Sequence, residues 1–68
     1  MSFSFNPLWK LLIDRGMTRE NLRVALKLSP STMAKMGKGE NVSMDVLNKI
    51  CNYLHVKLED IVEHIPEK

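Results

Sequence analysis

The chain has 68 residues, 44% of them hydrophobic, and ten Lys or Arg against eight Asp or Glu give a net charge of +2. This length predicts one domain, residues 1–68, with a thin core, and the ordinary apolar content argues against disorder. No stretch approaches the roughly 18 uninterrupted apolar residues of a membrane span. The opening MSFSFNPLWK lacks the basic region and cleavage site of a signal peptide.

Residues that carry metal or catalytic chemistry are sparse. The single cysteine, Cys51, precludes an internal disulfide and fits a reducing cytoplasm. Cys51 and His55 are four residues apart, but two ligands fall short of a closed zinc site, and Cys51 lies on an apolar stripe. No motif places a nucleophilic side chain beside a general base, and the sequence has no Gly-rich phosphate-binding loop. The sequence therefore predicts a cytoplasmic protein without enzymatic activity, metal, cofactor, small-molecule ligand or membrane contact.

The first residues alternate Ser and Phe with the period of a strand. This segment, Met1–Phe5, is too short to stand alone. We expect it either to pair with the short run Ile61–Ile65, closing the domain at its termini, or to mediate dimer contacts.

A first helix is predicted from Asn6 and Pro7 to the glycine stop at Gly16. Trp9 is a lone aromatic among core-type residues, so we interpret it as a packing anchor rather than a stacking platform for a base. The residues of the inner arc are Leu8, Trp9, Leu11, Leu12 and Ile13.

The central stretch, about residues 18–38, predicts two helices joined by a tight turn. Thr18 is expected to cap the first, about Thr18–Lys27, whose apolar face is Leu22, Ala25 and Leu26. An N-cap serine followed by proline begins the second, about Ser29–Lys38, and Gly39 is its left-handed stop. Met33 and Met36 form its buried side. The opposite side carries short hydroxyls and lysines, which suit phosphates and base edges: Ser31, Thr32, Lys35 and Lys38.

Two further helices are predicted after the loop 40–42. Ser43 caps one of them, whose apolar face is Met44, Leu47, Ile50, Cys51 and Leu54. A last short helix begins near Lys57, with core residues Leu58, Ile61 and Val62. The expected fold class is therefore all-α, with five helices.

The charges are unevenly distributed along the chain. Residues 1–39 carry seven bases and two acids, whereas residues 40–68 carry three bases and six acids. The bases concentrate around the predicted helix pair, which points to a polyanion partner at one end of the molecule. A solvated surface whose charges happen to segregate explains the same distribution, so charge alone leaves both interpretations open.

The order of these features resembles a known family. In chain order these features are G-M-T, the two-helix unit, S-x-S-T-M, G-K-G, and then S-M-D-V-L-x-K-I-C-x-x-L-x-V-x-L-E-D-I. Over about residues 7–62 it resembles the lambda-repressor-like helix-turn-helix DNA-binding domains, the Cro/cI-type or XRE family. It is most similar to short bacterial and phage regulators without a second domain. The resemblance implies a five-helix fold and sequence-specific DNA binding.

The resemblance also implies roles for single residues. Arg19 matches a position that touches the DNA backbone, and the recognition-helix positions match Ser31, Thr32 and Lys35. The phosphate-contacting positions after that helix match Lys38 and Asn41. The chain departs from the family pattern at three positions. Pro30 stands where some members have a base-reading glutamine, Arg23 replaces a small residue, and Lys27 replaces the turn glycine. Lys27 is then expected to adopt φ > 0, at a cost of about 1 kcal/mol.

The expected function is a transcriptional regulator, a repressor, whose third helix enters the major groove of double-stranded DNA while the second crosses the backbone. Lys35 is the candidate for direct readout, and counterion release is assigned to Arg19, Arg23, Lys27 and Lys38. A homodimer on a two-fold site is expected, with Val46, Tyr53 and the Phe3/Phe5 end as candidate contacts.

Two alternatives stay open from the residues alone. The less favoured alternative is that the hydroxyls of Ser31 and Thr32 only cap the first turn and that the lysines only provide solubility. The small size and apolar termini also fit a protein-interaction module on the same fold, such as an antitoxin or an anti-regulator.

Overall fold

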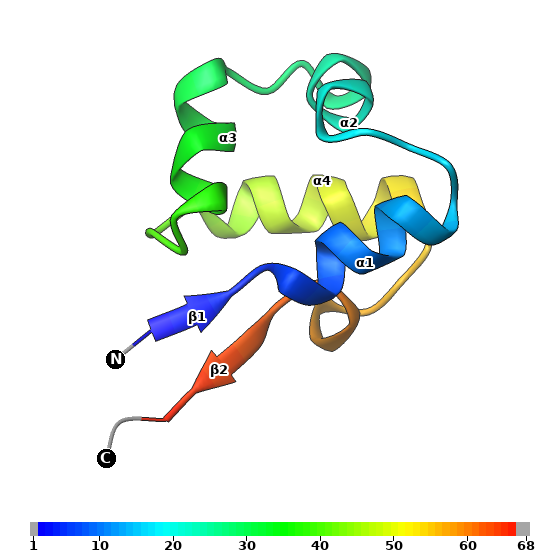
Figure 1. Ribbon diagram of the computed structural model, residues 1–68. Helices are drawn as coiled ribbons and strands as arrows, with labels where there is room; N and C mark the ends of the chain where they lie inside the picture. The colour runs from blue at the N-terminus through cyan, green and yellow to red at the C-terminus, as the bar shows by residue number, and fades with distance from the viewer. Residues whose placement is uncertain (1, 67–68) are drawn as a thin grey trace.

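A computed structural model describes residues 2–66 of the chain, which form four α-helices and a two-stranded sheet (Figure 1). In chain order the elements are β1 (Ser2–Ser4), α1 (Asn6–Asp14), α2 (Arg19–Leu26), α3 (Pro30–Gly37), α4 (Met44–Leu54), the 3-10 turn η1 (Leu58–Asp60) and β2 (Glu63–Ile65). In Figure 1, α4 runs beneath α2 and α3, and the two strands extend from one end of the helical body.

The helices begin and end where local hydrogen bonding predicts. The Thr18 hydroxyl accepts from the Asn21 N–H, and the Asn21 side chain accepts from the Thr18 N–H, both at 3.0 Å. Ser43 caps α4 in the same way by accepting from the Val46 N–H at 3.2 Å. Gly16 adopts φ 69° after α1, a left-handed conformation that glycine reaches without a Cβ clash.

The predicted fifth helix and the all-α class are corrected by the region after α4. Leu58–Asp60 makes only one 3-10 turn, which the Asp60 carboxylate closes by accepting from the Lys57 N–H at 3.0 Å. The chain then extends as β2 and pairs antiparallel with β1, with Phe3 opposite His64. Backbone pairing with the other end of the chain therefore outweighs the local helix signals there. The predicted pairing of the Ser/Phe segment is confirmed, while Met1 lies outside the described residues.

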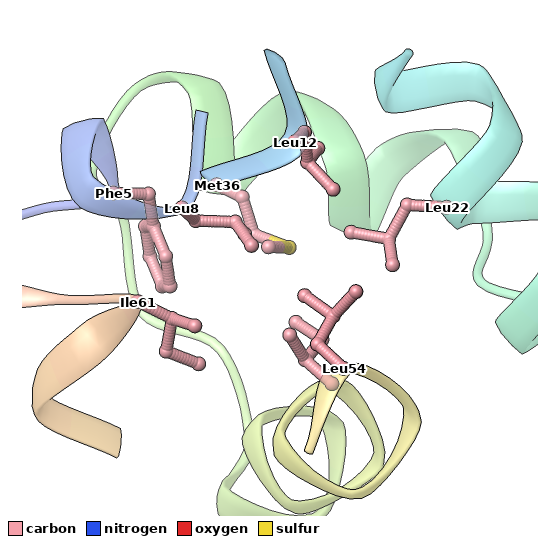
Figure 2. Packing of buried hydrophobic residues seen from close by; sticks show 8 residues of the cluster. Phe5, Leu8, Leu12, Leu22, Met36, Leu54 and Ile61 are labelled. Carbon is pink, nitrogen blue, oxygen red and sulfur yellow. The ribbon is translucent and has the colours of Figure 1, made fainter. Parts of the chain in front are cut away.

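The core draws on every α-helix and on the segments beside the sheet. Figure 2 shows its side chains converging, and the fully buried ones are Leu8, Leu12, Leu22, Met36, Ile50, Leu54 and Ile61. Phe5 packs at the edge of the cluster and is also buried. Ile13 and Met44 were expected inside but are 75% and 70% exposed, because each lies at the margin of its helix's apolar arc. Ala25 and Leu58 are exposed as well.

Candidate nucleic-acid interface

The turn between α2 and α3 determines the orientation of α3, whose outer face is the candidate interface. Lys27 has φ 56° and ψ 39°, so the predicted left-handed conformation at this residue is confirmed. Its N–H donates to the Val24 carbonyl at 3.2 Å, and the Leu28 N–H donates to the Arg23 carbonyl at 2.9 Å. This pair of bonds is the Schellman arrangement that normally recruits glycine. Leu28, which follows Lys27 in this turn, is buried.

The first turn of α3 holds three hydroxyls together. The Ser29 hydroxyl accepts from the Thr32 N–H at 3.2 Å, as expected of an N-cap. It also shares hydrogen bonds with the hydroxyls of Ser31, at 3.1 Å, and Thr32, at 2.9 Å. A hydroxyl has one donor and two acceptor sites, so these contacts orient both side chains and leave capacity for an outside partner. Ser31 is exposed and Thr32 is half-buried.

Lys35 is the centre of the exposed face of α3. Lys35, Thr32 and Asn41 line one shallow hollow between α3 and the start of α4, where Ser43 also borders it. Lys35 and Asn41 border a second hollow together with Glu40. The structure therefore brings two recognition-helix candidates, Thr32 and Lys35, next to Asn41, a residue of the following loop.

Lys38 lies apart from this group. It is exposed and borders a different hollow, where α3 meets α1 and β1, together with Trp9 and Gly37. Arg19, the first residue of α2, belongs to the same neighbourhood, because its Nη1 would lie only 3.5 Å from a Cβ placed on Gly37. Lys35 thus borders different hollows from Lys38, and Arg19 lies on the Lys38 side.

Arg23 is less available than the sequence indicates. Its Nε donates to the Glu20 carboxylate at 2.9 Å, and its Nη1 donates to the Leu28 carbonyl at 3.4 Å. Hydrogen bonding to Arg23 lowers the pKa of Glu20, and the same bond raises the pKa of Arg23. Sequence reasoning missed Glu20, although an acid three residues before an arginine on one helix is a readable signal.

A stacked pair links α1 to α2. The Arg19 guanidinium carbon lies 3.9 Å from the centroid of the Trp9 ring. The half-buried Trp9 packs against the core and lies beside Phe5, with ring centroids 6.4 Å apart. Ten residues separate the two partners of this stack, so no local pattern predicts it.

The structure offers little for other chemistry. Cys51 is half-buried against the core, and His55 follows α4 in a left-handed conformation. Within residues 2–66, no three His, Cys, Asp or Glu side chains gather where they could hold a metal ion. In the same range, no helix has the length and apolar character needed to cross a bilayer.

Comparison with known proteins decides the family. The family model of the Cro/C1-type HTH DNA-binding domain matches residues 7–67. The chain belongs to the Cro/C1-type helix-turn-helix family. This Cro/C1-type chain is also similar to a solved structure, the transcriptional regulator VanUg in its crystal form II, with 55% sequence identity and a TM-score of 0.93. The match covers 97% of this chain and 88% of that one, while a search of curated proteins found no match.

The comparisons confirm the resemblance that the sequence carries. Both the matched family and the solved neighbour support a DNA-binding regulator. The contact roles of individual residues are a separate question, which the geometry of α3 and its neighbours addresses.

Proposed function

We propose that this protein is a sequence-specific DNA-binding transcriptional repressor that places α3 in the major groove and α2 across the backbone. The observation that carries the proposal is the exposure of Ser31 and Lys35 on the outer face of α3. Had the chain's own packing covered them, α3 would have no face to offer a duplex. An α-helix fits the width of the major groove, and polar side chains on such a face reach base edges.

The proposed contacts divide by chemistry. Lys35 donates to guanine O6 or N7, while Ser31 and Thr32 bond a base edge or a phosphate. Arg19, Lys27, Lys38 and Asn41 contact phosphates, and the three charged members release counterions on binding. Arg23 contributes less to this effect because Glu20 already neutralises its guanidinium.

We further propose that two copies bind a two-fold site. One helix with three polar residues at its outer face reads only a few base pairs, and pairing half-sites multiplies the discrimination. Of the candidate dimer contacts, Phe5 is buried and Val46 is half-buried, which leaves Phe3 and Tyr53 as exposed aromatic residues. Sedimentation of the free and DNA-bound protein measures the stoichiometry, and one copy per selected site would refute the dimer.

The central test begins with selection of bound sequences from a random duplex pool. The selected duplex is then titrated with protein at several salt concentrations, beside a scrambled duplex of equal length. We expect a selected motif with two-fold symmetry and an affinity that falls steeply as salt rises. An affinity that is flat in salt, or no binding at micromolar protein and low salt, would overturn the proposal.

The repressor assignment needs its own experiment. A protein seated in the major groove over a promoter blocks polymerase, so transcription in vitro should fall when the selected site overlaps the promoter. Moving the site well upstream is the matched control and should restore transcription. Increased transcription in the first arrangement would refute repression while leaving DNA binding intact.

A protein-interaction module is the second candidate function. The observation in its favour is an apolar hollow of about 290 Å³ between the sheet and α4, lined in part by the exposed side chains of Phe3, Met44 and Leu58. Recovery of a stoichiometric protein partner, with no DNA retained, would favour this candidate over the first.

A further inference from the structure

The Trp9–Arg19 stack has a geometry suited to more than packing. The guanidinium carbon lies over the indole, 3.9 Å from the ring centroid. The indole packs against the core, and its ring centroid lies 6.4 Å from that of Phe5. Because a guanidinium attracts an aromatic ring through its face, its N–H donors in the plane of the group stay available.

Those donors have no partner inside the described chain. Within residues 2–66, the Arg19 side chain forms no ion pair with a carboxylate and no hydrogen bond to an acceptor. Arg23, one helical turn further along α2, provides the contrast because its guanidinium is bound by Glu20 and Leu28. The two arginines of one helix are therefore in opposite states, one satisfied and one open.

A second cation borders the same part of the surface. Arg19 Nη1 lies next to Gly37, and Lys38 follows Gly37 and lines the hollow that Trp9 also lines. The Arg19 guanidinium and the Lys38 ammonium group both carry donors that match the oxygens of a phosphate, which arginine binds in a bidentate way.

We propose that Trp9 is a positioning residue for DNA binding: it holds the Arg19 fork ready to grip one backbone phosphate. The inference rests on the DNA-binding function proposed above and assigns a role to a residue outside its contact set. A free arginine side chain loses rotamer freedom when it binds. Trp9 removes part of that freedom beforehand, so the loss on binding is smaller.

The test is a double-mutant cycle on DNA affinity with Trp9→Leu, Arg19→Ala and the double variant. We expect Arg19→Ala to lower the salt slope by about one. Trp9→Leu should weaken binding by roughly two- to tenfold when Arg19 is present, and by much less when residue 19 is alanine. Trp9→Phe should recover most of the affinity because it keeps an aromatic face beneath the guanidinium.

Two controls separate positioning from stability. Leu11→Ala removes another half-buried residue of α1 that packs against the core, and its effect on affinity should not depend on residue 19. Unfolding curves identify a temperature at which every variant is folded, and affinities are compared there. Trp9 is the single tryptophan of the chain, so its emission should change when DNA binds the wild-type protein and change less in Arg19→Ala.

The outcomes are distinct. If Trp9→Leu weakened DNA binding equally with arginine and with alanine at residue 19, Trp9 would have only a structural role. Unchanged affinity in Arg19→Ala would overturn the proposed phosphate contact, while salt-dependent binding by the wild type would still support the DNA-binding function. A wild-type protein that fails to bind any duplex would overturn the function itself.

Discussion

Lys27→Gly is expected to stabilise the fold while weakening DNA binding. Lys27 is held at φ 56° and ψ 39°, where a Cβ approaches the following carbonyl and costs a non-glycine residue about 1–2 kcal/mol. Glycine removes this strain but increases the conformational entropy of the unfolded chain, which lowers the free energy of unfolding by about 0.5–1 kcal/mol. The difference between these ranges is a net gain of about 0–1.5 kcal/mol, with a central value of about 0.75 kcal/mol. For a domain of this size the central value raises the midpoint of thermal unfolding by about 3–6 °C.

The assay is urea unfolding followed by circular dichroism, with three matched variants. Lys27→Ala keeps the backbone strain and removes the charge, so its stability should stay close to that of the wild type. His55→Gly repeats the experiment after α4, where φ is 57°, and should stabilise the fold by a similar amount without affecting DNA. Both Lys27 variants should lower the salt slope of DNA binding by about one. A less stable Lys27→Gly would refute the reasoning, because it would mean that the lysine side chain outweighs the backbone strain.

Three further predictions concern the interface and its support. Lys35→Ala should reduce discrimination between bases by about 1–3 kcal/mol at one base pair, measured by competition with single-substitution duplexes. Lys38→Ala should instead lower the affinity for all DNA sequences alike, and the reverse pattern would exchange the roles of the two lysines. Glu20→Gln should free Arg23 and steepen the salt slope, and an unchanged slope would mean that Arg23 faces no phosphate. Gly39→Ala should lower the free energy of unfolding by more than about 1 kcal/mol, since φ is 71° and the new Cβ would lie 2.6 Å from a carbonyl oxygen of β1; unchanged urea unfolding would contradict that close approach.

Acid should act on the Glu20–Arg23 pair in a defined direction. The folded-state pKa of Glu20 is lowered by hydrogen bonding to Arg23, so the contribution of this pair to stability is present above the unfolded-state pKa. It is lost as the pH falls through the lower, folded-state pKa. This contribution is measured by comparing the free energy of unfolding of the wild type with that of Glu20→Gln across the acidic pH range. An identical pH dependence in the two proteins would exclude it. The Glu20 side chain is 67% exposed, so the effect should be small.

The starts of the four α-helices and the stops of α1, α2 and α3 could be predicted from the sequence because those signals act within a few residues, whereas the left-handed His55 that ends α4 was not predicted. Thr18, Ser29 and Ser43 accept from N–H groups three residues ahead of them, and the left-handed Lys27 and Gly39 close helices with equally short hydrogen bonds. The outer face of α3 follows from the same local periodicity. The family resemblance, which the comparisons confirm, depends on this ordered set of local signals.

The sequence left pairing between the two ends of the chain as one of two possibilities, and the other contacts between distant parts of the chain required the tertiary structure. The 3-10 turn and β2 replace a predicted helix because the far end of the chain supplies a pairing strand. Arg19 stacks on Trp9 because packing of α1 against α2 brings them together, and Gly39 must lack a Cβ because the backbone of Phe3 passes beside it. The sequence by itself thus determined α1 to α4 and their exposed cations. Only the packed chain decided which cations have a partner within residues 2–66 and which do not, since a side chain's partners depend on what folding brings within a few ångströms.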